Sequence, residues 1–222
     1  MKHSEQAYPQ GLLRISLDGN TDLSVRSACS ILLKNWIDYH WNASSEKFKE
    51  PIASEETKIY VRQNLPQGLS VSQRGVRSLL SAALAIVASF DWPEVWPELI
   101  PSLLQALDSS DINTVDGSLR TLKEFTQDVT DTNAPEILVQ ILPKLLNVMM
   151  NPTSHAVSIS RSIQILTSLT SICGDIKAEK LDQNHFKSIL NVFAQCVHKN
   201  IETDDDWAVK VLHIEMITKI QI

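Results

Sequence analysis

A two-residue pattern, in which a basic residue follows an apolar or small one, recurs along the chain every 41 to 51 residues. The pairs are Val25-Arg26, Val76-Arg77, Leu119-Arg120, Ser160-Arg161 and Val209-Lys210. Each lies in a stretch whose apolar residues are three and four apart, which is the period of one face of an α-helix. A helical unit of this length cannot bury its apolar face alone, so neighbouring units have to stack.

The second helix of each unit repeats as well, because residues 99–107 (LIPSLLQAL) align with residues 141–149 (ILPKLLNVM) at an offset of 42. A period of about 40–47 residues built from two helices is typical of HEAT and armadillo repeats. Only 6 of the 222 residues are glycine, which favours long helices over hairpins. The sequence therefore predicts an all-α HEAT-repeat solenoid, a superhelix of stacked antiparallel helix pairs. The uneven spacing disfavours a coiled coil or a four-helix bundle.

The apolar periodicity also predicts the individual helices. They are expected near residues 22–40, 54–67, 72–90, 99–107, 112–129, 134–150, 157–173, 184–199 and 207–222. In the first of these, Val25, Ala28, Cys29, Leu32 and Trp36 are predicted to lie on one face. A short apolar piece at 12–17 resembles half of a helix whose partner is missing. The ends carry no polar capping repeat, so we expect the N-terminal repeats of a longer protein without its first helix.

Residues 91–99 (DWPEVWPEL) are predicted to form a corner between two helices. Pro93 and Pro97 end the first helix and are tolerated only near the start of the next one. Asp91 and Glu94 have the spacing of a capping box. Trp92 and Trp96, four residues apart, are predicted to face the same side and to hold the helices at a fixed angle. On physical grounds alone this stretch is a helix–helix corner.

The composition argues against several classes of protein. A net charge of −6 and a pI near 5.5 disfavour nucleic-acid binding, because that function requires a basic surface. The negative charge is compatible with a partner rich in Lys and Arg. It is equally typical of an ordinary acidic cytosolic protein. Cys29, Cys173 and Cys196 are predicted to be reduced core residues. The longest apolar run, 79–90, is too short to span a bilayer, and no signal peptide opens the chain.

The sequence contains no motif of a hydrolase, kinase or metalloenzyme. We therefore expect no enzymatic activity, no cofactor and no metal site. Asp204, Asp205 and Asp206 form an acidic turn, which is predicted to be solvated and to cap the following helix. A contact between this turn and a basic cargo protein is the alternative.

Several passages carry a resemblance to a known family. They are LSVRSACSILLKNWIDYHW, IYVRQNLPQGL, the DWPEVWPEL corner and LRTLKEFTQDVTDT. They resemble the importin-β (karyopherin-β) family of nuclear transport receptors and look closest to its importin-9 group. The resemblance covers nearly the whole chain, with residues 8–69 similar to the N-terminal Ran-binding region and residues 70–222 to further HEAT repeats, about five repeats in all.

The resemblance implies a function in nuclear import. Members of the family bind the GTP-loaded form of the GTPase Ran, mainly through the second helices of the N-terminal repeats. They carry cargo past the nucleoporins and shuttle between cytoplasm and nucleus, and the importin-9 group is associated with basic cargo such as histones and ribosomal proteins. Neither direct nucleic-acid binding nor membrane insertion is implied.

Candidate Ran-facing residues are the polar ones on the two second helices of this region. These are Lys58, Arg62 and Gln63 on the helix at 54–67, and Glu98, Ser102 and Gln105 on the helix after the corner. An ordinary solvated helix face explains each of them equally well. The alternative function is that of a HEAT-repeat scaffold or regulatory subunit of a complex unrelated to transport.

Overall fold

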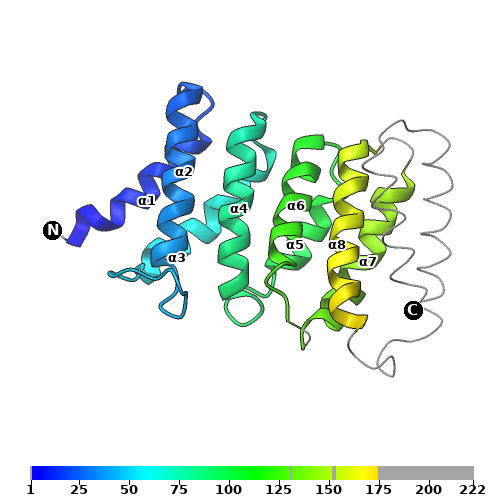
Figure 1. Ribbon diagram of the computed structural model, residues 1–222. Coiled ribbons are helices and arrows are strands. Elements are labelled where there is room, and N and C mark those ends of the chain that lie inside the picture. The colour runs from blue at the N-terminus through cyan, green and yellow to red at the C-terminus, as the bar shows by residue number, and fades with distance from the viewer. Residues whose placement is uncertain (1, 131, 152–153, 175–222) are drawn as a thin grey trace. The chain divides into compact units, whose positions relative to one another are not determined.

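The computed structural model describes residues 2–130, 132–151 and 154–174 (Figure 1). These residues form helices, turns and bends with no strand among them, which confirms the predicted all-α class. The chain divides into two compact units, residues 1–125 and 126–222, and each is described by itself. No helix in the described part of the chain combines the length and the apolar character that a membrane span requires.

The helices of the two units are as follows. Unit 1 contains α1 (Lys2–Leu17), α2 (Leu23–His40), α3 (Glu55–Asn64), the 3₁₀-helix η1 (Leu65–Ser70), α4 (Arg74–Asp91), α5 (Leu99–Ala106) and α6 (Ile112–Phe125). The described part of unit 2 contains α7 (Ala134–Met150) and α8 (Ala156–Gly174), which pack against each other. The helices predicted at 184–199 and 207–222 lie outside the described residues, as does Cys196.

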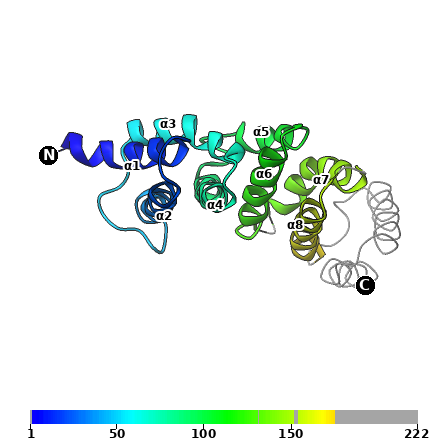
Figure 2. The ribbon, with the colours of Figure 1, turned by 90° about the horizontal axis from the view of Figure 1, so that it is seen from above.

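Unit 1 is built of two layers of helices (Figure 2). The first layer holds α2, α4 and α6, and α4 packs against both of its neighbours. The second layer holds α1, α3 and α5, with α1 packed on α2 and α5 packed on α6. Unit 1 therefore has the alternation that the sequence predicts, in which each helix of one layer is followed by a helix of the other.

The core of unit 1 lies between the layers and along α4. Leu80, Leu84 and Val87 of α4 are fully buried, and burial of one such side chain contributes about 1.5–3 kcal/mol. Gly117 of α6 allows an unusually close contact with η1, because a Cβ atom there would lie 2.6 Å from the carbonyl oxygen of Leu69. Only glycine fits at that point without a shift of the backbone.

Side-chain caps fix where several helices begin. Asp22 accepts a hydrogen bond from the Ser24 amide of α2 (2.8 Å), and Ser54 accepts one from the Thr57 amide of α3 (3.3 Å). Asp111 accepts from the Thr114 hydroxyl (2.7 Å) and amide (3.1 Å) at the start of α6. The Thr114 hydroxyl, followed by the amides of the first turn, lowers the pKa of Asp111 below its ordinary value. Such caps satisfy amides that have no partner within the helix.

Three helix boundaries differ from those predicted. The helix predicted at 112–129 is α6, which ends at Phe125. The helix α1 extends back from the predicted piece at 12–17 to Lys2 and continues through Pro9, which is buried. The predicted helix at 54–67 is instead α3 followed by η1, with Pro66 at the start of the tighter helix. Proline has no amide hydrogen for an α-helical bond, so it is tolerated in the first turn of a new helix.

The helix α2 does not bury the apolar face that its spacing picks out. Cys29 is buried and its thiol is free, as predicted, but Val25 and Leu32 are exposed. The residues that α2 buries instead are Arg26, Ser30, Leu33 and Ile37, together with Cys29. Packing against α1 and α4 selects this face, which is rotated from the more apolar one.

Candidate functional site

The carboxylate of Asp91 joins three segments that are distant in sequence. Trp41, at the end of α2, donates from Nε1 to Oδ1 of Asp91 (3.0 Å), and Arg62 of α3 donates from Nε to Oδ2 (2.9 Å). The side chains of Arg62 and Asp91 are only 16% and 7% exposed. Removing one partner of a buried ion pair is destabilising, because the other charge stays buried without compensation. Asp91 therefore fixes α3 against the ends of α2 and α4.

The cations of α3 gather around Trp41. The Cζ atom of Arg62 lies 5.9 Å and the Nζ atom of Lys58 lies 5.7 Å from the ring centroid of Trp41, within the range of cation–π interactions. Arg62 also donates from Nη2 to the exposed carboxylate of Glu55 (2.9 Å). We call Trp41, Glu55, Arg62 and Asp91 the Asp91 cluster. Gln63, the next residue along α3, is exposed.

The capping role predicted for Asp91 is wrong. Asp91 is the last residue of α4, and its carboxylate is occupied by Trp41 and Arg62. The next helix, α5, begins only at Leu99, and Glu98 at its N-cap makes no side-chain capping bond. The main-chain carbonyl oxygen of Asp91 accepts hydrogen bonds from the amides of Val95 (2.8 Å) and Trp96 (2.9 Å). The spacing of a capping box was present, but a buried indole and a guanidinium compete successfully for the carboxylate.

The other corner residues lie at different depths. Trp92 is half-buried and packs edge-to-face on Phe125 of α6, with 5.7 Å between the ring centroids. Trp96 is half-buried too, whereas Pro93 and Pro97 are exposed. The corner is thus held to α6 through Trp92 and to α3 through Asp91, and its prolines point outward.

The polar residues of α5 form one exposed face. Glu98, Ser102 and Gln105 are spaced four and three residues apart and are all exposed, while the opposite side of α5 is apolar and buried. None of the three engages in a side-chain hydrogen bond or ion pair within the described part of the chain. We call these three residues the α5 face. It lies in the same layer as α3 (Figure 2).

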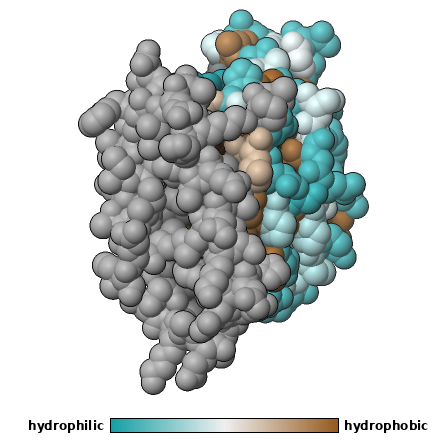
Figure 3. Space-filling model, turned by 90° about the vertical axis from the view of Figure 1, so that its right-hand side faces the viewer, coloured by the Kyte–Doolittle hydropathy of each residue, from teal (hydrophilic) through white to brown (hydrophobic). Residues whose placement is uncertain are grey.

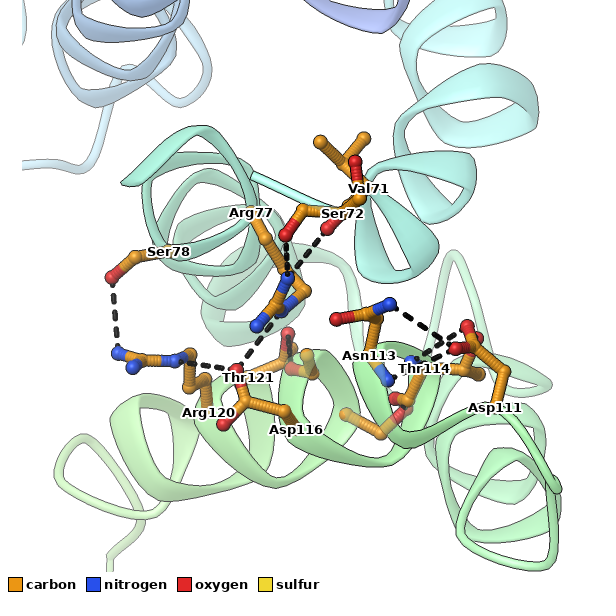
Figure 4. Close-up of polar contacts among 12 residues, drawn as sticks. Val71, Ser72, Arg77, Ser78, Asp111, Asn113, Thr114, Asp116, Arg120 and Thr121 are labelled. Carbon is orange, nitrogen blue, oxygen red and sulfur yellow. Dashed lines mark hydrogen bonds and ion pairs between the residues drawn. The ribbon is translucent and has the colours of Figure 1, made fainter. Parts of the chain in front are cut away.

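A second ionic network connects α4 to α6 (Figure 4). Asp116 of α6 accepts from Nε of Arg77 (2.9 Å) and from Nε of Arg120 (3.1 Å). Arg77 also donates to the Ser72 carbonyl (3.1 Å), and Arg120 donates to the Ser78 hydroxyl (3.1 Å). Arg77 and Arg120, two of the basic residues that mark the repeat in the sequence, are therefore packing residues. Asp116 was not predicted, although its place four residues before Arg120 is a recognisable ion-pair spacing.

The remaining predicted residues lie elsewhere. Asp204, Asp205 and Asp206 fall outside the described residues. Among the residues that are described, no three His, Cys, Asp or Glu side chains come together in a way that could hold a metal ion. The exposed polar residues of the α5 face and Gln63 of α3 are surface residues of unit 1.

Comparison with models of known protein families shows the family to which this chain belongs. A model of the importin-β N-terminal domain matches residues 2–71, which cover α1 to η1. A model of the exportin 1-like protein family matches residues 73–215, well over half of the chain. The chain belongs to the importin-β family. This family consists of transport receptors and is not a class of enzymes.

Curated relatives from distant organisms agree with this assignment. Importin-9 of Drosophila melanogaster is 24% identical over 193 residues, which is 85% of this chain and 19% of that protein. An importin β-like SAD2 homolog of Arabidopsis thaliana is 26% identical over 210 residues, 90% of this chain and 20% of that protein. This importin-β family chain thus spans about a fifth of the length of these relatives.

Solved structures share the fold. A crystal structure of importin β superimposes with a TM-score of 0.73 over 97% of this chain and 26% of that one, at 17% identity. A structure of a Kap95:Nup1 complex gives a TM-score of 0.71 over 97% of this chain and 25% of that one, at 16% identity. The predicted fold class, a HEAT-repeat solenoid, is thereby confirmed.

Proposed function

We propose that this chain is part of a nuclear import receptor and binds Ran-GTP through the layer that contains α3 and α5. The observation that carries the proposal is the α5 face, because its three polar side chains are exposed and take no part in packing. The match of residues 2–71 to the importin-β N-terminal domain supports it. We also propose the division of the chain into residues 8–69, as the N-terminal Ran-binding region, and residues 70–222, as further HEAT repeats that add the α5 face to the contact.

The proposed contact residues differ in the exposure of their side chains and in the contacts that these side chains already make. Gln63, Ser102 and Gln105 are exposed and can exchange hydrogen bonds with a partner. Glu98 adds a negative charge at the beginning of α5. Lys58 and Arg62 are half-buried, and each also packs on Trp41, so a partner would have to share them with the fold.

We further propose basic proteins, such as histones or ribosomal proteins, as cargo. The net charge of −6 supports this, since opposite charge steers association between partners. Asp204, Asp205 and Asp206 are the proposed cargo contact. As part of such a receptor, the chain would meet nucleoporins and shuttle between cytoplasm and nucleus. A relative of the same fold was solved as a Kap95:Nup1 complex.

The test is a titration of the chain with Ran loaded with a non-hydrolysable GTP analogue or with GDP, alongside a circular dichroism spectrum. We expect the GTP form to bind at least about tenfold more tightly, a difference of about 1.4 kcal/mol. Helical protein that binds neither form, or both forms equally, would contradict the proposal and favour a scaffold unrelated to transport.

A pair of variants localises the binding. Ser102→Glu combined with Gln105→Glu places two charges on the α5 face and is expected to weaken Ran-GTP binding. The matched control is Glu124→Ala, which changes an exposed residue of α6 in the other layer. Equal loss of binding in both proteins would place the contact outside the α5 face.

A further inference from the structure

The helices α3 and α5, which carry the proposed contact residues, differ in how much of each is buried. The helix α5 has eight residues and buries four apolar side chains. The helix α3 has ten residues, packs on α1 and continues into η1, but buries only Thr57 and Val61. Stabilisation by apolar packing grows with the apolar area that is buried. Apolar packing therefore holds α3 less firmly than α5.

The side chain of Asp91 supplies a further attachment of α3. Its Oδ2 atom accepts from Nε of Arg62 in the last turn of α3, and its Oδ1 atom accepts from the Trp41 indole. Arg62 and Lys58 also lie over the Trp41 ring. Hydrogen bonds between charged groups are stronger than those between neutral groups. The contact fixes the last turn of α3 at the end of α4.

The main chain of the same residue holds the corner that leads to α5. The Asp91 carbonyl oxygen accepts from the amides of Val95 and Trp96. The Trp96 carbonyl oxygen accepts in turn from the amide of Leu99 (3.2 Å), which is the first residue of α5. Asp91 is thus connected to α3 through its side chain and to α5 through two successive turns of the main chain.

Asp91 and Trp41 are themselves out of reach of a partner protein, because they are only 5% and 1% exposed. The described residues that Figure 3 shows at the surface are mostly hydrophilic, with single hydrophobic side chains among them. Polar groups at the surface are therefore common in this chain, whereas a buried carboxylate is rare in proteins unless it is paired. Any effect of Asp91 on binding has to pass through the helices that it holds.

We propose that Asp91 is a positioning residue for the binding of Ran-GTP, which it controls without touching Ran. The inference rests on the proposed function, in which α3 and α5 contact Ran-GTP together. Two helices can contact one partner at the same time only if their spacing matches it. When the matching arrangement is populated for only a fraction of the time, the apparent affinity falls by that fraction. The side chain of Asp91 keeps this fraction high by holding α3.

The substitution Asp91→Asn separates the contacts that Asp91 makes. The oxygen of the new side chain can still accept from Trp41, but its NH₂ group is a donor and meets the N–H donor of Arg62. The main-chain bonds to the corner remain. The variant therefore loosens α3 and leaves the connection to α5 in place. We expect the affinity of the full chain for Ran loaded with a non-hydrolysable GTP analogue to fall about fivefold.

The matched control is Asp116→Asn, which makes the same substitution and the same change in net charge. Asp116 accepts from Arg77 and Arg120, and both of these lie in the other layer, on α4 and α6 (Figure 4). The control also weakens an ionic network, so it should lower stability, and urea denaturation compares the two variants. We expect it to bind Ran-GTP within about 1.5-fold of the unchanged chain.

Hydrogen exchange of the free chains gives a readout that a loss of global stability would not produce. A released helix of ten residues is marginal on its own, so loosening of α3 should appear as exchange at least about tenfold faster in residues 55–64 of Asp91→Asn. The other helices of unit 1 should exchange as they do in the unchanged chain. In Asp116→Asn, α3 should keep its slow exchange.

A second variant, Trp41→Phe, tests the same attachment from the other side. It keeps an aromatic ring under the cations of α3 but removes the indole N–H group that holds Oδ1 of Asp91. Since the bond between Arg62 and Asp91 remains, we expect a smaller loss of affinity for Ran-GTP, about threefold. No loss in Trp41→Phe and none in Asp91→Asn would overturn the proposal.

The remaining outcomes separate this inference from the proposed function. Faster exchange confined to α3, with a loss of Ran-GTP affinity in Asp91→Asn and not in Asp116→Asn, supports the inference. Equal losses of affinity in these two variants, or faster exchange spread over all of unit 1, would make Asp91 a stabilising residue only and contradict it. If the unchanged chain does not prefer Ran-GTP to Ran-GDP, the proposed function itself fails, and the titration of the unchanged chain shows this before any variant is compared.

Discussion

The helices α3 and α5 lie in the same layer of unit 1, but their polar side chains are used differently. On α3, Arg62 is bonded to a buried carboxylate and an exposed one, and Lys58 lies over Trp41. On α5, the three residues of the α5 face are exposed and make no such bonds among the described residues. Both sets are polar residues on second helices, and sequence alone made them equal candidates for partner binding.

The difference teaches that residue type and helix position do not identify a binding residue in a stacked-helix protein. Each helix has to be attached to its neighbours, and some polar side chains make those attachments. The Asp91 cluster attaches α3, whereas α5 is attached through buried leucines and through Trp92 of the preceding corner. Stability and binding should therefore respond to different residues.

The largest effect is expected for Asp91→Ala. It leaves the Trp41 indole nitrogen and the Nε atom of Arg62 without their acceptor, which should lower the free energy of unfolding by about 3 kcal/mol. Urea denaturation followed by circular dichroism measures it. The control is Glu94→Ala in the same corner, where the side chain is exposed. A loss below about 1 kcal/mol for Asp91→Ala would show that the cluster does not attach α3.

Gly117→Ala tests the attachment of η1, which continues α3. The new Cβ atom would lie 2.6 Å from the Leu69 carbonyl oxygen, which is too close. We expect the free energy of unfolding to fall by about 2 kcal/mol. This net value includes the gain of up to about 1 kcal/mol that replacing Gly by Ala brings in a helix. Gly75→Ala in α4 is the matched control, since nothing lies within 4 Å of its Cβ; that variant should be neutral or more stable. Thermal melting of the two variants gives the comparison.

Neighbouring residues of α3 sharpen the contrast further. Arg62→Ala should lower the free energy of unfolding by about 1–2 kcal/mol, because it removes both carboxylate contacts and leaves Asp91 with Trp41 alone. Gln63→Ala, one residue along and exposed, should change it by less than about 0.5 kcal/mol. Denaturant titrations of both variants measure these values. Equal changes in the free energy of unfolding would mean that Arg62 contributes no more to stability than Gln63.

The smallest effect on stability is expected for Ser102→Ala combined with Gln105→Ala. Both side chains are exposed, so the free energy of unfolding should change by less than about 0.5 kcal/mol. If the proposed function is correct, the same protein loses several-fold in affinity for Ran-GTP, which isothermal titration calorimetry measures. Unchanged affinity would remove the α5 face from the binding site.

Much of the fold follows from the sequence. The spacing of the apolar–basic pairs predicted stacked helix pairs, because a face of period 3.6 has to be buried against a neighbouring unit. What periodicity does not specify is which apolar face finds a neighbour. Val25 and Leu32 belong to a well-formed apolar face, yet α2 buries Arg26, Leu33 and Ile37 instead. The choice depends on contacts with α1 and α4, which local spacing does not encode.

The candidate site was less predictable. The helices that carry it were found from the sequence, and the exposure of Gln63, Ser102 and Gln105 agrees with a surface position. The role of Asp91 was not found, because its partner Trp41 lies 50 residues away and no local rule connects them. Asp116 was missed for a similar reason, since its bond to Arg77 spans 39 residues. Whether the candidate residues contact Ran stays a prediction.

Hydrogen exchange measured by mass spectrometry, with and without Ran-GTP, tests the central claim most directly. The account predicts slower exchange on addition of Ran-GTP in peptides that cover α3 and α5, and little change in α2, α4 and α6. Protection that appears only in the α2–α4–α6 layer, or no protection at a saturating concentration of Ran-GTP, would contradict it.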